Sequence, residues 1–455
     1  MKRFTLRQIL NSCNGEFFGD SSLLDKAVSS IVTDSRQVKE NSLFVAVVGE
    51  RVDGHDFAQQ CFEKGAVCVL CEKKIDIPNG KTAILVKSTL QAIKEIAKAY
   101  RELFTIPFIG ITGSVGKTST KEMIAAALGE SFCVLKTQGN FNNELGVPLT
   151  LFRLEDCHEI AVIEMGISDF GEMTRLTAMV EPDICVITNI GYCHLERLKD
   201  LDGVLKAKTE MFISMQKNGK IFLNGDDEKL RTVTDVSGIK PVFYGLDSRN
   251  DYYAADIVNN ADEKLKCKIC YDDMCLDTVI PALGNHMAAN AVCAFAIAKS
   301  LGMTDEKILN GIAKYKTVGS RSNVIKTDSF TIIDDCYNAN PTSMRSSIDM
   351  LKNFTGRRVC ILGDMKELGE NELALHLSTG EYAATSKIDL VIAIGELAEK
   401  IAEGAKGKGA KAVHFDTVEK ANDSLSSLLE RGDVILVKAS RAMKLENVIE
   451  KLKEL

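Results

Sequence analysis

The chain lacks several features that would assign it to a specialised class of protein. It has no run of 18 apolar residues, and its first residues, Met1-Lys-Arg-Phe-Thr-Leu-Arg-Gln, are already amphipathic. We therefore expect no membrane span and no secretion signal, and a cytoplasmic location. Basic residues are not in excess either, because 56 Lys and Arg face 63 Asp and Glu. The resulting net charge of −7 argues against broad nucleic-acid binding, which needs a basic surface.

The cysteines lack the spacing of a zinc ribbon. Fourteen cysteines without an export signal predict reduced thiols in the cytosol. Two CxxC pairs occur, Cys68–Cys71 in an apolar run and Cys267–Cys270 in an alternating pattern. A shared zinc site would need these distant pairs to meet, so ordinary core cysteines are the favoured interpretation.

Length and composition predict a multidomain globular protein without repeats or low-complexity tracts. At 455 residues, with 45% hydrophobic and 26% charged residues, the chain exceeds one typical core, and about three domains are expected. Short apolar runs alternate with helical patterns through most of the chain, which indicates parallel sheets covered by helices. We predict an α/β protein with a small mixed α/β domain (1–97), a central P-loop parallel-sheet domain of ATPase type (98–315) and a Rossmann-like carboxyl-terminal domain (316–455).

The most informative motif is the glycine-rich stretch between Gly110 and Thr118. An apolar run leads into it and a helical pattern begins at Lys117. Glycines let backbone N–H groups turn towards a polyphosphate, the lysine adds a point charge and Thr118 offers a hydroxyl to Mg²⁺. Five residues, not the usual four, separate Gly110 from Gly116. The stretch still predicts ATP or GTP binding. The expected nucleotide contacts are Gly113, Ser114, Val115, Gly116, Lys117, Thr118 and Ser119.

Polar side chains follow other predicted strands of the central region. Glu164 ends one apolar run, where ligands of parallel sheets bind, and is suited to Mg²⁺. His194 follows the next run, and beside a phosphate loop it is a candidate metal or phosphate contact. Amide groups cluster at Asn140, Asn142 and Asn143, which can donate to phosphate or sugar oxygens. Lys208 lies in a helical pattern and on composition alone would be a solvated lysine.

The last third of the chain carries comparable strand-end loops. The stretch Asp334 to Ser343 is dense in polar side chains and predicts a recognition loop. Similar loops follow strands at Gly363–Gly369 and at Lys438–Arg441. Two α/β domains that face each other would form a cleft able to close over substrates.

Taken together, these residues resemble the Mur ligase family, the ATP-dependent amide-forming enzymes of bacterial cell-wall precursor synthesis. The long glycine spacing is normal for that family. The resemblance spans essentially the whole chain in the expected order. The motifs that carry it are Thr33–Arg36, Arg51–Phe57, Gly139–Pro148, Asp334–Ser343 and Gly363–Gly369.

The resemblance implies an activity and roles for single residues. The activity is ligation of D-alanyl-D-alanine to a UDP-N-acetylmuramoyl-tripeptide by a monomer, through an acyl phosphate, with ATP and two Mg²⁺ ions. The catalytic residues are then Lys117, His194 and Lys208; Thr118 and Glu164 bind one Mg²⁺, and His194 with a carbamylated Lys208 helps to hold a second. The remaining implied contacts are Asn290, Arg321 and Asp335 for ATP, Ser35, Arg36, Asn140, Asn142 and Asn143 for the UDP substrate, and Asn338, Asn340 and Ser343 for the dipeptide.

Two departures and three alternatives accompany this interpretation. Gly319-Ser320-Arg321 replaces the more usual Gly-Arg pair, and Ala439 stands where glycine is common. The alternatives are a folylpolyglutamate-type or other amino-acid-adding ligase, a P-loop ATPase or kinase that acts as a switch or motor, and a non-catalytic nucleotide-binding protein. The first should lack the motifs at Arg51–Phe57 and Tyr337–Pro341, and the second predicts nucleotide turnover without amide formation.

Overall fold

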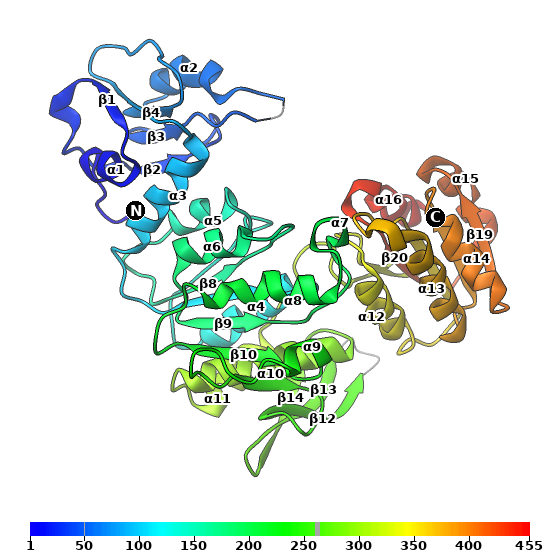
Figure 1. Cartoon of the computed structure of the whole chain (residues 1–455). Coiled ribbons are helices and arrows are strands. Elements are labelled where there is room, and N and C mark those ends of the chain that lie inside the picture. The colour runs from blue at the N-terminus through cyan, green and yellow to red at the C-terminus, as the bar shows by residue number, and fades with distance from the viewer. Residues whose placement is uncertain (50, 260–263) are drawn as a thin grey trace.

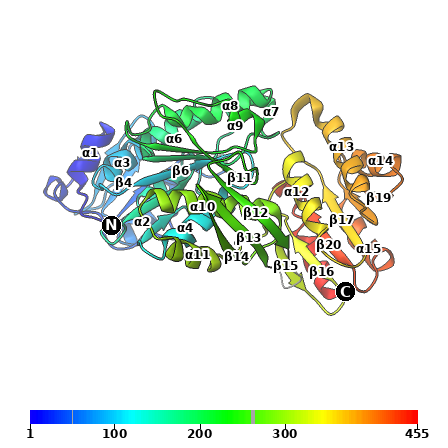
Figure 2. The same cartoon turned by 90° about the horizontal axis from the view of Figure 1, so that it is seen from below.

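The chain folds around three β-sheets, each built from its own stretch of sequence (Figure 1). The structure is a computed structural model that describes residues 1–49, 51–259 and 264–455. In two views at right angles the central sheet lies between the amino-terminal part and the carboxyl-terminal part (Figures 1 and 2). The predicted α/β class is confirmed.

The amino-terminal sheet has the order β1-β5-β4-β3-β2, with only β1 antiparallel to its neighbour. Strand β4 is wholly buried, as its apolar sequence predicts. The elements are α1 (Leu6–Cys13), β1 (Glu16–Gly19), η1 (Ser21–Leu23), β2 (Ser30–Val32), β3 (Ser42–Val45), η2 (Gly54–Phe57), α2 (Ala58–Glu63), β4 (Cys68–Cys71), β5 (Thr82–Leu85) and α3 (Thr89–Arg101). Helix α3 runs through the boundary predicted at residue 97. Its Tyr100 joins the first and central parts, since the hydroxyl accepts from Lys2 N and donates to Leu154 O.

The central sheet has nine strands in the order β14-β13-β12-β11-β10-β9-β6-β8-β7. Strands β6 to β12 are parallel to their neighbours in the sheet, and β13 and β14 add an antiparallel edge. Its elements are β6 (Phe108–Thr112), α4 (Lys117–Leu128), β7 (Val134–Lys136), α5 (Gly146–Leu151), β8 (Ile160–Glu164), α6 (Glu172–Val180), β9 (Ile184–Ile187), α7 (Leu195–Leu198), α8 (Leu201–Thr209), η3 (Glu210–Phe212), β10 (Lys220–Asn224), α9 (Glu228–Arg231), β11 (Val242–Gly245), β12 (Tyr252–Asn259), β13 (Leu265–Tyr271), β14 (Met274–Ile280), α10 (Asn285–Ser300) and α11 (Asp305–Ala313).

The β13–β14 hairpin corrects the expectation that all thiols are reduced. Cys270 and Cys275 stand directly opposite each other in the antiparallel register and are joined by a disulfide. The hairpin turn between them brings their Cα atoms to 4.1 Å. Cys68, Cys71 and Cys267 are buried free thiols, so the two CxxC pairs form no shared site.

The carboxyl-terminal sheet has the order β15-β16-β20-β17-β18-β19 and is parallel except for β15. Its four inner strands are nearly continuous apolar runs, because helices cover both faces. The elements are β15 (Asn323–Lys326), β16 (Thr331–Asp334), α12 (Pro341–Leu351), β17 (Arg358–Gly363), η4 (Gly369–Asn371), α13 (Glu372–Thr385), β18 (Leu390–Ile394), α14 (Glu399–Gly407), β19 (Lys411–Phe415), α15 (Val418–Leu428), β20 (Val434–Lys438), η5 (Arg441–Met443) and α16 (Glu446–Glu454).

Candidate active site

The glycine-rich loop lies where the order of the central strands reverses. Strand β6 has β8 on one side and β9 on the other, so three strand ends meet at the loop that follows β6. The loop is anchored by the exit of β9: Val115 N donates to Asn189 Oδ1 over 2.8 Å, and Gly191 N donates to Ser114 Oγ over 2.8 Å. A Cβ at Gly113, whose φ is 152°, would lie 1.9 Å from Thr188 Oγ1, so only glycine fits there.

Lys117 begins helix α4 and folds back over the loop. Its Nζ donates to Gly113 O over 2.8 Å. Burial lowers the pKa of Lys117, and the Glu164 carboxylate opposes that shift. The ammonium thus lies at a helix amino terminus, and helix amino termini bind phosphate groups through their backbone N–H groups.

Glu164 ends strand β8 and is almost completely buried. Its carboxylate accepts from Thr118 Oγ1 over 2.8 Å and from Asn142 Nδ2 over 2.9 Å. Carboxylate and hydroxyl oxygens are the ligands that Mg²⁺ prefers. The structure therefore brings together three of the residues predicted from separate segments of sequence.

The three clustered asparagines have different roles. Asn143 Oδ1 accepts from the N–H of Gly146, the first residue of helix α5, over 2.8 Å. Asn140 is exposed, and only Asn142 reaches the buried carboxylate. A single sequence could not separate these roles, because all three types of contact suit asparagine.

Lys208 lies on the inner face of helix α8, only 1% exposed. Its Nζ makes no hydrogen bond or ion pair with any residue that the structure describes. Burial lowers the pKa of Lys208 to about 8; Cys193 opposes the shift and Lys117 adds to it. A buried, unpaired amine beside the phosphate loop is costly and marks a functional position.

His194 precedes helix α7 with a φ of 51°. Its Nδ1 lies 2.5 Å from Oε2 of Glu367, which belongs to the predicted loop Gly363–Gly369 but was given no role of its own. Burial lowers the pKa of His194; Glu367 opposes this, whereas Lys208 and Lys117 add to it. The electrostatic couplings place His194, Lys208 and Lys117 in one cluster.

Asn290 lies on helix α10, which packs against helix α4. Its Oδ1 accepts from Thr120 Oγ1 over 3.0 Å, so the amide is fixed near the loop helix. Ser119 hydrogen-bonds Tyr315, whose pKa is raised mainly by burial. Tyr315 was not predicted, since an isolated tyrosine after a helix carries no sequence signal.

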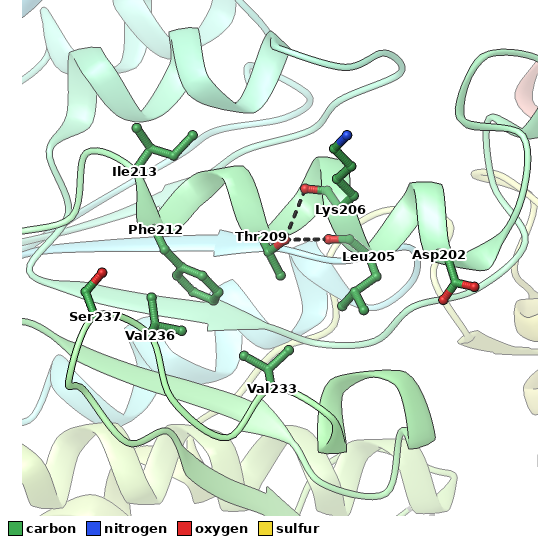
Figure 3. A pocket seen from close by; sticks show the side chains of 9 residues that line it. All are labelled: Asp202, Leu205, Lys206, Thr209, Phe212, Ile213, Val233, Val236 and Ser237. Atoms are coloured by element: carbon green, nitrogen blue, oxygen red, sulfur yellow. Dashed lines mark hydrogen bonds between the residues drawn. The ribbon is translucent and has the colours of Figure 1, made fainter.

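A cavity of about 550 Å³ is lined by helix α8 and by side chains of the segments 212–213 and 233–237 (Figure 3). Its lining is mostly apolar, and Lys208 is not part of it. The lining residues are Asp202, Leu205, Lys206, Thr209, Phe212, Ile213, Val233, Val236 and Ser237. The predicted phosphate and metal residues are absent from this lining, so the cavity is distinct from the candidate site.

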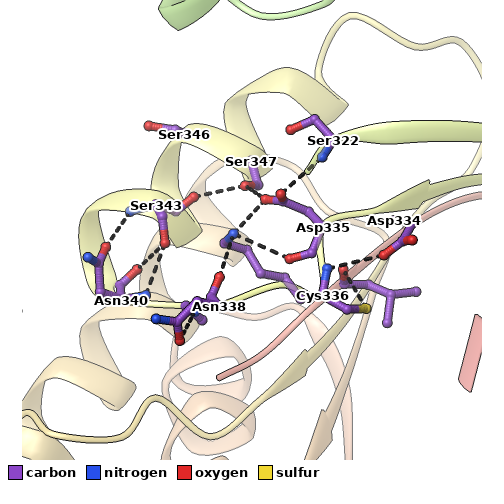
Figure 4. Close-up of polar contacts among 12 residues, drawn as sticks. Ser322, Asp334, Asp335, Cys336, Asn338, Asn340, Ser343, Ser346 and Ser347 are labelled. Atoms are coloured by element: carbon purple, nitrogen blue, oxygen red, sulfur yellow. Dashed lines mark hydrogen bonds and ion pairs between the residues drawn. The ribbon is translucent and has the colours of Figure 1, made fainter. Parts of the chain in front are cut away.

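The third sheet presents a polar network at the end of β16 (Figure 4). Asp335 accepts from Lys438 Nζ over 2.5 Å, from Ser347 Oγ over 2.6 Å and from Ser322 N over 3.0 Å. Lys438 also donates to Asn338 O over 3.1 Å. The network fixes the loop that carries the predicted nucleotide and dipeptide residues.

Other predicted residues of this loop have local partners. Arg321 stacks over the Tyr337 ring at 3.8 Å. Asn340 and Ser343 form a reciprocal capping box at the start of helix α12. The cap uses Asn340 Oδ1 and Ser343 Oγ and leaves the Asn340 amide nitrogen available.

The start of α12 touches the central site, so the two parts meet at the loop. A Cβ at Gly191 would lie 2.9 Å from Thr342 Oγ1 and 3.4 Å from Ser114 Cβ. Ser35 and Arg36, by contrast, lie in the amino-terminal part. Arg36 is exposed and paired with Asp34 over 2.7 Å, and Ser35 O accepts from Lys64 over 3.1 Å.

Comparisons with known proteins match this arrangement along the whole chain. The family models described as Mur ligase family, catalytic domain, Mur ligase middle domain, and Mur ligase, glutamate ligase domain match residues 27–103, 111–298 and 320–441. The chain belongs to the Mur ligase family. No described helix is both long and apolar enough to cross a membrane.

The relatives share one name. The UDP-N-acetylmuramoyl-tripeptide–D-alanyl-D-alanine ligase of Bacillus subtilis is 38% identical over 94% of this chain and 93% of its own length. The Escherichia coli enzyme of that name is 35% identical over 99% and 98%. A crystal structure of MurF from Acinetobacter baumannii has a TM-score of 0.91 at 29% identity over 100% of both chains. MurF of Thermotoga maritima in complex with ADP has a TM-score of 0.83 at 30% identity over 93% and 97%.

Proposed function

We propose that this chain joins D-alanyl-D-alanine to a UDP-N-acetylmuramoyl-tripeptide in a reaction driven by ATP. The observation that carries the proposal is the full-length similarity to enzymes of that name, which includes all three sheets. The predicted ligase class and the peptidoglycan-precursor reaction agree with it. A folylpolyglutamate synthase shares only the fold, at 15% identity and a TM-score of 0.65.

The reaction needs an activated carboxyl group. The terminal carboxylate of the tripeptide attacks the γ-phosphorus of ATP, a new C–O–P linkage forms and ADP leaves. The dipeptide amine then attacks the carbonyl carbon, loses a proton, and inorganic phosphate leaves as the amide forms. Lys117 and the backbone donors of the loop hold the phosphate oxygens on which charge builds up.

The donor set fits magnesium. Thr118 and Glu164 supply hard oxygens at one position. His194 and Lys208 belong to a second, provided that Lys208 is carbamylated. Magnesium would neutralise the phosphate charge during transfer.

The chemistry of Lys208 supports carbamylation. The neutral amine adds to CO₂ and releases a proton, so that a carbamate anion replaces an ammonium ion. With a pKa of about 8, about one-tenth of the amine is neutral at pH 7, against less than about one-thousandth for an ordinary lysine. Because Lys208 Nζ has no hydrogen-bond or ion-pair partner among the described residues, no such contact is broken when the carbamate forms.

The remaining assignments belong to the same proposal. Asn290, Arg321 and Asp335 contact ATP, the amino-terminal part binds the UDP substrate through Ser35 and Arg36, and Asn338, Asn340 and Ser343 face the dipeptide. The enzyme acts as a cytoplasmic monomer, with three domains that divide near residues 97 and 315.

The test is an ADP-release assay with Mg²⁺, the UDP-linked tripeptide and D-alanyl-D-alanine. We expect ADP release to require both substrates and to match pentapeptide formation one to one. Equal turnover without the dipeptide, or with a single amino acid in its place, would overturn the proposal. The first outcome would favour a P-loop ATPase, and the second another amino-acid-adding ligase.

A further inference from the structure

Two left-handed residues from different sheets face each other beside the phosphate loop. His194 has a φ of 51° and Glu367 a φ of 64°. Such a backbone is uncommon for residues other than glycine, and its strain is usually maintained at functional sites. Both of these residues take part in the same contact, between the His194 imidazole and the Glu367 carboxylate.

The contact has three parts. His194 Nδ1 lies 2.5 Å from Glu367 Oε2. Leu195 N, the next residue, donates to Glu367 O over 3.1 Å. Gly369, at a φ of 65°, lies against the same turn, since a Cβ there would be in ordinary contact with Glu196 N at 3.4 Å. Side chain and backbone of one loop therefore hold the turn that carries the histidine.

The carboxylate decides which ring nitrogen of His194 carries the proton. A carboxylate can only accept, so the neutral ring must place its proton on Nδ1. The lone pair of Nε2 is then free for a ligand. Carboxylate partners of this kind orient histidines that bind metals, and their loss typically costs 10- to 100-fold in affinity or activity.

We propose that Glu367 is a positioning residue for His194, supplied by the third sheet when that part docks on the central site. The inference rests on the proposed function for its effect on catalysis. The loop Gly363–Gly369 thus links the position of the third sheet to the orientation of His194. The imidazole is oriented only when the third sheet lies against the central site.

The kinetic test compares Glu367→Ala and Glu367→Gln with Glu370→Gln. Glu370 is exposed in η4, directly after this loop, and serves as the control. We expect Glu367→Ala to lower kcat about 10- to 100-fold with KM for ATP nearly unchanged. Glu367→Gln should lose less, because its amide oxygen still accepts from Nδ1. Glu370→Gln should match the parent.

A spectroscopic test does not depend on turnover. The chain has six histidines, and long-range ¹H–¹⁵N spectra, assigned with His194→Gln, report the proton position on each ring. We expect the Nδ1–H form of His194 in the parent and a mixed population in Glu367→Ala. An unchanged tautomer in that variant, or parental kcat, would overturn the inference. If the parent failed to ligate the dipeptide, the tautomer would still test the contact by itself.

An independent observation lies at the opposite edge of the central sheet. Cys133 precedes β7, and Cys157 and His158 precede β8. One donor atom from each lies within 4.8 Å of the other two. Both cysteines are exposed free thiols, and Glu159 holds Cys133 in place through both of its backbone groups.

We infer that Cys133, Cys157 and His158 form a surface site for a thiophilic divalent cation such as Zn²⁺. Two thiolates and an imidazole with an open fourth position are a known zinc donor set. The carboxylates of Glu155 and Glu159 interact electrostatically with Cys133, and these acidic groups attract a cation. When the cation binds, two thiol protons are released. His158 Nδ1, which accepts from Glu155 N in the structure, then loses that hydrogen bond and binds the cation.

The test is a Co²⁺ and Zn²⁺ titration of the full chain. We expect one equivalent of Co²⁺ to give a thiolate charge-transfer band that Zn²⁺ displaces. Cys133→Ser and Cys157→Ser should abolish the band, His158→Ala should weaken binding, and Asp156→Asn, which changes an exposed neighbour, should leave it unchanged. A band retained in both serine variants would overturn the site, as would a Cys133–Cys157 disulfide without metal uptake.

Discussion

Lys208 of the central part and Lys438 of the third sheet are both buried but differ in their partners. Lys438 is 3% exposed, and its ammonium donates to Asp335 and to the backbone oxygen of Asn338. Lys208 is 1% exposed and has no such partner among the described residues. The first lysine completes a structural network, whereas the second carries a desolvation cost that folding alone does not explain.

The difference indicates that Lys438 stabilises the structure, whereas Lys208 takes part in the reaction. Around Asp335 the charged groups already satisfy one another, so the network can fix a loop before any ligand arrives. Around the phosphate loop, Lys117, Lys208 and the Nε2 atom of His194 leave donors or lone pairs for a ligand. Substitutions of the two lysines should therefore fail in different ways.

The largest effect is expected from Lys208→Ala. The change should lower kcat on the order of 100- to 1,000-fold, because the second metal position loses its anionic ligand. Acetate or propionate should partly restore activity by occupying the vacated volume as a carboxylate. Lys206→Ala is the control, since Lys206 lies exposed on the same helix near the Phe170 ring. Absence of rescue would contradict carbamylation.

Lys438→Met should act mainly on stability. It leaves a buried carboxylate without its cation, which typically costs about 3–5 kcal/mol. Calorimetry should show a lower unfolding temperature. Lys420→Met is the matched control, because Lys420 pairs with Asp416 over 2.6 Å while both side chains are more than 60% exposed, and it should lose less than about 1 kcal/mol. Equal losses in the two variants would remove the distinction between buried and exposed pairs.

Lys208→Met should instead raise stability in bicarbonate-free buffer. The folded-state pKa of about 8 lies below the ordinary 10.5, so the native state binds fewer protons between these values. Below pH 8 the buried ammonium costs about 3 kcal/mol, and this cost disappears as the pH rises towards 10.5. The advantage of the variant should therefore shrink over that window in denaturant titrations. An advantage independent of pH would contradict the assignment.

Local patterns were enough to predict the elements that carry the site. A glycine-rich turn between an apolar run and a helical pattern placed the start of α4 at Lys117, and β17 (Arg358–Gly363) ends where the strand-end loop Gly363–Gly369 was predicted to begin. The carboxylate at the end of β8 was found because parallel strands deliver their ends to one edge.

Contacts that cross from one sheet to another, and contacts set by strand register or local backbone, were not predictable. Glu367 reaches His194 only through the docking of two sheets, and nothing near either residue encodes that approach. The hairpin disulfide depended on strand register, although two cysteines flanking a short Asp-Asp turn could have indicated it. The sequence also could not distinguish Asn142, which donates to Glu164, from Asn143, which accepts from the start of helix α5. That difference depends on the conformation of the local backbone.

Arg36→Ala is expected to have the smallest effect on stability. It should change KM for one substrate only. Arg36 is exposed and its pair with Asp34 spans two residues, so unfolding should change by less than about 1 kcal/mol. If its guanidinium holds a diphosphate, KM for the UDP-linked substrate should rise about tenfold, while kcat and KM for ATP stay unchanged. Arg7→Ala, which breaks the similar exposed pair with Asp25, should leave every constant unchanged. If KM for the UDP-linked substrate were the same in both variants, Arg36 would not belong to the substrate site. Its role would then be only the exposed ion pair with Asp34, comparable to that of Arg7 with Asp25.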